Sequence, residues 1–150
     1  MLLVCLRHCG CLFTRQALAD LAQHRERIEA EGAAIILTQP GPAAPLSGLA
    51  ARYDLTDLAH IDDAPPGFYQ ALGLPRGGFG ALFGRRVRRA GLTAFFSEGH
   101  RVGWLAGDGR QLGGWVLFLP PDRGIVRAQE HSGDRMDYDW IMARLSGFEA

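Results

Sequence analysis

The sequence predicts an α/β fold, in which a central mixed β-sheet is flanked by helices on both faces to give three layers. Two apolar runs of strand length, residues 2–6 and 33–37, are separated by a long amphipathic segment at residues 14–31. Two further runs, residues 115–119 and 124–128, flank a Pro-Pro-Asp-Arg turn. Strands joined by a helix run parallel and strands joined by a tight turn run antiparallel, so the sheet is expected to be mixed.

The first part of the chain predicts a β-α-β unit. Residues 2–6 (LLVCL) are apolar throughout, as in a strand that is buried on both faces. Residues 14–31 repeat apolar side chains at helical spacing, and Gly32 stands where such a helix would end. Residues 33–37 (AAIIL) are apolar on both faces, which is typical of a central parallel strand.

The remaining elements are shorter. Residues 46–53 predict a short helix, residues 58–61 a third strand and residues 68–72 another short helix. Residues 73–84 are rich in glycine and predict an insertion without regular structure. The hairpin and a closing helix at residues 138–145 complete the chain.

Charge and composition exclude several classes of function. Sixteen basic and sixteen acidic side chains cancel, so neither a nucleic acid nor a membrane is expected as a partner. All the basic residues are arginine, and without lysine the chain cannot be a Schiff-base enzyme, a pyridoxal-phosphate enzyme or a P-loop NTPase. The basic run at residues 85–89 (RRVRR) predicts a solvated helix face, with binding of an anionic partner as the alternative.

The three cysteines, Cys5, Cys9 and Cys11, are clustered near the N-terminus. An odd, clustered set is not the framework of a secreted disulfide-rich protein. The N-terminal run has neither the shape of a signal peptide nor the length of a membrane span, so the cytoplasm is the expected location. His8, Cys9 and Cys11 have the chemistry to hold a soft ion, but no second pair of ligands has suitable spacing, so no metal or other cofactor is expected.

Cys11 is the strongest candidate for chemistry. We expect it at the N-terminus of the first helix, beyond the carboxyl end of the first strand, where open α/β sheets place their sites. Unpaired backbone amides and the helix dipole favour a thiolate there, and the thiolate is the nucleophilic form of cysteine. Arg7 and His8 are expected to add positive charge. Cys11 is therefore a candidate nucleophile for attack on a peroxide or a disulfide.

The loop around Cys11 resembles that of one known family. Residues 4–15 (VCLRHCGCLFTR) are similar to the redox loop of the peroxiredoxin-like branch of the AhpC/TSA group, within the thioredoxin-like superfamily. Thr14 stands where that branch has its resolving cysteine, and Leu12 where it has a proline. Further segments resemble later parts of the branch, namely residues 63–74, 107–108, 111–116, 122–128 and 133–134.

The resemblance implies a single thioredoxin-like domain over residues 1–150, which lacks the N-terminal hairpin usual in the branch. It implies an antioxidant thiol oxidoreductase in which Cys11 attacks, Arg7 and Thr14 assist, and an external thiol restores the enzyme. The expected reductant is a small thiol or a thioredoxin-type protein. The expected residues of the substrate pocket are His8, Gly113, Gly114 and Trp115.

Several alternatives remain open. Cys9 lies close enough in sequence to resolve an oxidised Cys11, but the ring would be small and strained, so a one-cysteine cycle is favoured. Thr14 either hydrogen-bonds the Cys11 thiolate or satisfies amides at the helix start. The alternative to an enzyme is a redox-inactive thioredoxin-like module that binds a partner or forms a homodimer.

Overall fold

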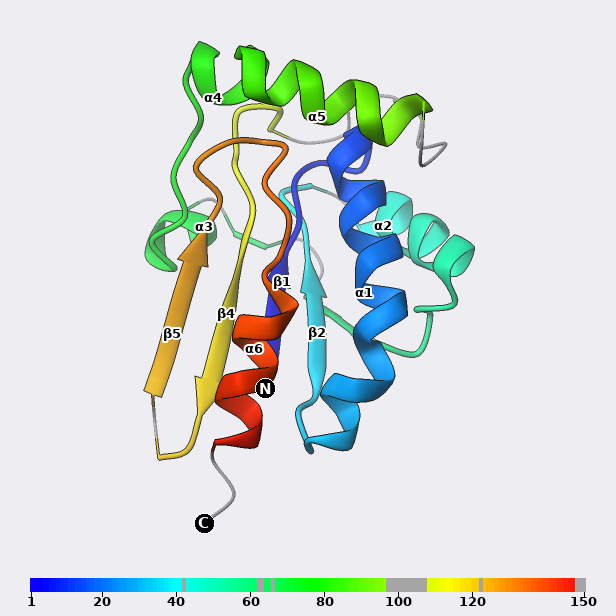
Figure 1. Ribbon diagram of the computed structural model, residues 1–150, viewed down its shortest axis with the longest axis vertical. Helices are drawn as coiled ribbons and strands as arrows, with labels where there is room; N and C mark the ends of the chain where they lie inside the picture. The colour runs from blue at the N-terminus through cyan, green and yellow to red at the C-terminus, as the bar shows by residue number, and fades with distance from the viewer. Residues whose placement is uncertain (42, 62–63, 66, 97–107, 122, 148–150) are drawn as a thin grey trace.

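The computed structural model describes residues 1–41, 43–61, 64–65, 67–96, 108–121 and 123–147. Its strands are β1 (Leu2–Cys5), β2 (Ile35–Thr38), β3 (Ala59–Ile61), β4 (Gly114–Leu119) and β5 (Arg123–Ala128). They form one sheet in the order β3-β2-β1-β4-β5 (Figure 1). β1, β2 and β3 are parallel to one another, whereas β4 is antiparallel to both β1 and β5. The predicted α/β class and mixed sheet are confirmed.

The helices follow the predicted order, with one addition. They are α1 (Leu12–Ala30), α2 (Ala43–Ala50), the 3-10 helix η1 (Ala51–Tyr53), α3 (Phe68–Ala71), α4 (Phe79–Phe83), α5 (Arg85–Phe96) and α6 (Tyr138–Ser146). α4 lies within the glycine-rich stretch that predicts irregular structure, and α5 extends the basic run as far as Phe96. That part of the prediction was wrong, because α4 (FGALF) contains a glycine and is too short to show a helical apolar pattern.

The two faces of the sheet are covered by different helices. The face towards α1, α2 and α6 holds the larger core, which includes Leu37 and Leu117. The opposite face holds a smaller core, in which Leu3 packs with Tyr69 of α3. The Tyr69 hydroxyl donates a hydrogen bond to the Leu6 carbonyl at 2.7 Å. Burial on both faces therefore fixes the strand that leads to the Cys11 loop.

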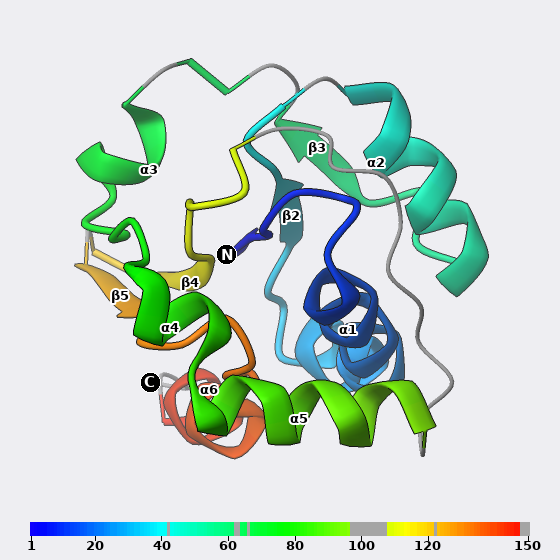
Figure 2. The same cartoon turned by 90° about the horizontal axis from the view of Figure 1, so that it is seen from above.

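α4 and α5 lie across the end of the sheet where β1 and β2 finish (Figures 1 and 2). α5 approaches the first turn of α1 closely at Gly91, where an added Cβ would lie 3.7 Å from the Phe13 ring. The loop before α6 supports α4, since the Ser132 amide donates to the Ala81 carbonyl at 2.9 Å. The two helices thereby form one wall of the space around Cys11.

Asp63, Gly107 and Asp122, which belong to segments that resemble the family, lie outside the described residues.

Among the helices that the structure does describe, none has both the length and the apolar character needed to cross a bilayer.

Candidate active site

Cys11 is the N-cap residue of α1, with an extended backbone at φ −77° and ψ 132°. The loop before it is held by the His8 carbonyl, which accepts hydrogen bonds from the Cys11 amide at 2.9 Å and from the Thr14 hydroxyl at 3.1 Å. Thr14 is buried, and its hydroxyl proton is used for this carbonyl. Thr14 thus shapes the loop, which differs from both of the roles predicted for it.

Arg7 is buried and uses all three of its guanidinium nitrogens. Nη1 donates to the Cys11 sulfur at 2.9 Å, Nε donates to the Gln111 carbonyl at 3.2 Å, and Nη2 donates to the Gly109 carbonyl at 2.9 Å. Arginine has no acceptor and stays charged, so the contact suits a sulfur that carries negative charge. The predicted association of Arg7 with Cys11 is thus present as a direct contact.

A cleft of about 470 Å³ opens beside the Cys11 side chain. Arg7, His8, Cys11 and Arg110 supply its polar side, together with the backbone of Gly109. Its apolar side comes from the start of α1 and from α4 and α5, through Leu12, Phe13, Leu82, Phe83 and Val87. Cys11 is only 7% exposed, and it lines this cleft.

His8 shares the cleft but does not provide the predicted positive charge. Burial lowers its pKa, and the neighbouring Arg7 guanidinium lowers it further, which outweighs the opposite effect of Asp108. The imidazole is therefore mostly neutral at neutral pH. Arg7 supplies the positive charge at the sulfur, and His8 contributes a ring that can accept or donate a proton.

The other two cysteines lie in the cores on either side of β1. The Cys9 thiol donates to the Gln39 side chain at 2.5 Å, and burial raises its pKa to about 11. Cys5 packs under α3, where burial raises its pKa to about 12. All three cysteines are free. Cys9 is thus a protonated thiol engaged with Gln39, which makes it a poor resolving group.

These pKa values predict an order of alkylation. In the folded chain at neutral pH, iodoacetamide should label Cys11 first, because Cys5 and Cys9 are almost wholly protonated and only the thiolate reacts. Labelling of Cys9 should rise about tenfold per pH unit until pH approaches its pKa. Peptide mass spectrometry measures the order, with the denatured chain as the control in which all three react. Equal labelling of Cys9 and Cys11 in the folded chain would contradict the prediction that Cys11 is the most reactive of the three thiols.

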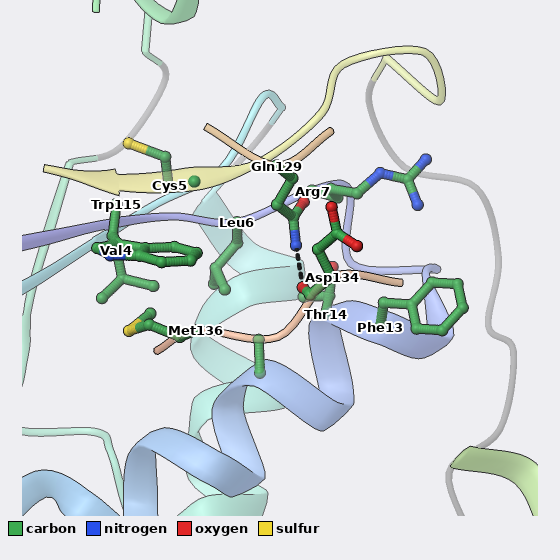
Figure 3. Close-up of a pocket in the computed structure, with 12 residues that line it drawn as sticks. Val4, Cys5, Leu6, Arg7, Phe13, Thr14, Trp115, Gln129, Asp134 and Met136 are labelled. Atoms are coloured by element: carbon green, nitrogen blue, oxygen red, sulfur yellow. Dashed lines mark hydrogen bonds between the residues drawn. The ribbon is translucent and has the colours of Figure 1, made fainter. Parts of the chain in front are cut away.

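Gly113, Gly114 and Trp115 lie away from the cleft. Trp115 packs in the larger core, and Figure 3 shows its indole beside Val4, in a cavity of about 30 Å³, while the Arg7 guanidinium extends away from it. Gly114 also lines that small cavity. Gly113 is needed for packing, because a Cβ there would lie 2.5 Å from the Cys5 carbonyl oxygen. Of the expected pocket residues, the structure places His8 alone beside Cys11.

Two residues that hold the site were not predicted for it. The Gln111 side chain is buried and donates to the Leu74, Pro75 and Leu112 carbonyls, which fixes the backbone that accepts from Arg7. Asp108 forms a turn through its contact with the Arg110 amide at 2.9 Å, and this turn presents the Gly109 carbonyl. Backbone acceptors leave no trace in the pattern of side chains, so no sequence signal pointed to them.

In the described part of the chain, no three His, Cys, Asp or Glu side chains lie close enough together to hold a metal ion. His8, Cys9 and Cys11 do not form such a group.

Comparison with protein-family models, with curated proteins and with solved structures finds no match to this chain. The assignment of function therefore depends on the geometry of the cleft and on the residues that line it.

Proposed function

We propose that this chain is a one-cysteine, peroxiredoxin-like thiol oxidoreductase of thioredoxin-like fold, with Cys11 as the nucleophile. The observation that carries the proposal is the contact at 2.9 Å between Arg7 Nη1 and the Cys11 sulfur. The resemblance of residues 4–15 to the redox loop of the peroxiredoxin-like branch of the AhpC/TSA group points the same way. The sheet order and the position of Cys11 after β1 are compatible with a thioredoxin-like fold.

The environment of the sulfur suits a nucleophile. A guanidinium held by two carbonyls cannot turn away, so its charge is already oriented when the reaction begins. Cys11 is the N-cap residue of α1, so the positive end of a helix dipole lies at this residue, but its side chain makes no cap hydrogen bond with the helix amides. The cleft gives a substrate access to the sulfur from the side of α4 and α5.

The chemistry balances with a hydroperoxide as oxidant. The Cys11 thiolate attacks the terminal oxygen, an S–O bond forms and the O–O bond breaks, and the sulfur is oxidised by two electrons to a sulfenic acid. The leaving oxygen takes up a proton and departs as an alcohol or as water. His8 lines the same cleft, and its imidazole is a group that can carry this proton.

Recovery needs an external thiol, since Cys9 is engaged with Gln39. A first thiol attacks the sulfenic sulfur, forms a mixed disulfide and releases water. A second thiol attacks the mixed disulfide, which releases the Cys11 thiolate and a disulfide of the reductant. The cycle consumes one hydroperoxide and two thiols, so a reducing cytoplasm with a small thiol or a thioredoxin-type protein would sustain it.

The proposal is tested by trapping the sulfenic acid. After exposure of the folded chain to hydrogen peroxide or cumene hydroperoxide, dimedone should add to Cys11 and to neither Cys5 nor Cys9. Cys11→Ser should abolish thiol-dependent peroxide consumption, whereas Cys9→Ala should retain most of it because Cys9 takes no part. Peptide mass spectrometry and a coupled peroxide assay measure both.

Absence of a Cys11 adduct in the folded chain, together with equal peroxide consumption by Cys11→Ser, would reject the enzyme. The alternative, a redox-inactive binding or dimerisation module of the same fold, is favoured by the exposed apolar side chains of α4 and α5.

A further inference from the structure

The surface formed by α4 and α5 differs from the rest of the molecule. Among the described residues, seven large apolar side chains are exposed, and five of these lie on α4 and α5. They are Phe79, Phe83, Leu92, Phe95 and Phe96. Phe79 and Phe96 protrude most, with 82% and 76% of their surface exposed. Such a concentration of exposed aromatic side chains marks a contact surface rather than an ordinary solvated one.

The same surface is strongly basic. α5 contains Arg85, Arg86, Arg88 and Arg89, all of them exposed, and residues 79–96 contain no acidic residue. Arg86 contacts Asp134 at 3.2 Å, whereas the other three form no ion pair with any described residue. The net charge of the whole chain is zero, which predicts no membrane partner. The fold nevertheless gathers these four arginines on one helix, so the charge is unevenly distributed over the surface.

The geometry of α5 directs both kinds of side chain outwards. Val87 and Ala94, seven residues apart, are buried and face the protein. Arg85, Arg89, Leu92 and Phe96 follow one another at helical spacing on the opposite side. The outward stripe is therefore basic in the first half of the helix and apolar in the second. α4 and α5 lie together along one end of the molecule (Figures 1 and 2), so the exposed residues of both helices belong to the same end.

We infer that the α4–α5 surface docks on anionic lipid bilayers. Arginine forks pair with lipid phosphates, and phenylalanine side chains enter the boundary between headgroups and acyl chains. The protruding phenylalanines suit a deformable lipid surface better than a rigid acidic protein, which would need a matching pocket for each ring. An RNA partner would find the same positive charge, so RNA binding is an outcome that the test below separates from lipid binding.

The inference is independent of the chemistry proposed for Cys11, but the two surfaces adjoin. Phe83 lines the Cys11 cleft and is also 60% exposed on the docking surface. A chain docked through α4 and α5 would hold the mouth of the cleft at the lipid boundary. Docking and peroxide reduction are measured separately, so one can fail while the other holds.

Flotation of the full chain with phospholipid vesicles tests the inference. The chain should bind vesicles of phosphatidylcholine mixed with phosphatidylserine, and bind pure phosphatidylcholine vesicles much more weakly. Arg88→Gln/Arg89→Gln should weaken binding about 25-fold, because each arginine near an anionic surface contributes about fivefold. The matched control, Arg52→Gln/Arg123→Gln, removes the same charge from exposed positions outside α5 and should retain binding.

The apolar part of the surface is tested by Phe96→Ser, with Val126→Ser on β5 as its control. Phe96→Ser should weaken binding about tenfold, since an exposed phenylalanine contributes its apolar area only on insertion. Circular dichroism verifies that each variant keeps its fold. No binding to the mixed vesicles, equal losses in the two arginine pairs, or binding to polyuridylate or polyglutamate without binding to vesicles would each overturn the inference.

Discussion

Replacement of Arg7 by methionine is expected to slow the oxidation of Cys11 by hydrogen peroxide about 100-fold, if Cys11 is the nucleophile proposed above. Methionine has similar length and no donor, so the sulfur loses its contact with a charged group. A charge-assisted hydrogen bond is worth about 1.5–3 kcal/mol, which corresponds to about 10- to 150-fold in rate. The rate is measured by dimedone trapping of Cys11 over time.

The effect of Arg7 on the stability of the fold can be measured separately from its effect on the oxidation of Cys11. Arg7→Met also leaves the buried Gln111 carbonyl and the part-buried Gly109 carbonyl without their donor, so the free energy of unfolding should fall by about 2 kcal/mol. Arg7→Lys keeps a positive charge but lacks the guanidinium fork. Its rate of Cys11 oxidation should lie between those of the unchanged chain and Arg7→Met. Arg110→Met is the matched control, because Arg110 lines the cleft without donating to the sulfur. Equal rates for Arg7→Met and the unchanged chain would remove Arg7 from the mechanism.

Replacement of Leu117 by alanine is expected to have the largest effect on stability. Leu117 is fully buried at the centre of β4 and belongs to the larger core between the sheet and the helices α1 and α6. Truncation should lower the free energy of unfolding by about 3 kcal/mol, since buried leucines lose both transfer energy and packing contacts. Urea denaturation followed by circular dichroism measures the change.

The control for this variant is Val126→Ala on β5, where the side chain is 41% exposed. It should lower the free energy of unfolding by well under about 1 kcal/mol, as is usual for partly exposed positions. Similar losses for the two variants would mean that the sheet face towards α1 and α6 is not the main core.

The fold was predictable where the apolar pattern is local and regular. The uninterrupted run around β1 and β2 and the Pro-Pro turn before β5 specify strands from their own residues. α1 begins at Leu12, two residues before the predicted start, because its N-cap is Cys11 rather than one of the usual Ser, Thr, Asp or Asn signals. The second half of α5 exposes apolar side chains, which contradicts the pattern that prediction relies on.

The site was predictable only in its local part. Arg7 and Cys11 are four residues apart in one loop, so their proximity follows from the chain itself. Gln111 and Gly109 reach Arg7 from more than 100 positions away, and only the folded sheet brings them there. Trp115 lies opposite Val4 in the register of β1 and β4, which turns its indole to the α1 face and away from the cleft.

The dependence of Arg7 on two distant carbonyls has a consequence for biosynthesis. The three thiols emerge from the ribosome long before the segment that carries Gly109 and Gln111. Until that segment joins the sheet, Arg7 has no anchor, and Cys11 remains a common thiol in a nascent peptide. The anchored contact between the Arg7 guanidinium and the Cys11 sulfur therefore forms late, once the segment with Gly109 and Gln111 has been made and has joined the fold. If Cys11 is the proposed nucleophile, an incomplete chain is therefore expected to be oxidised more slowly at this sulfur than the folded chain.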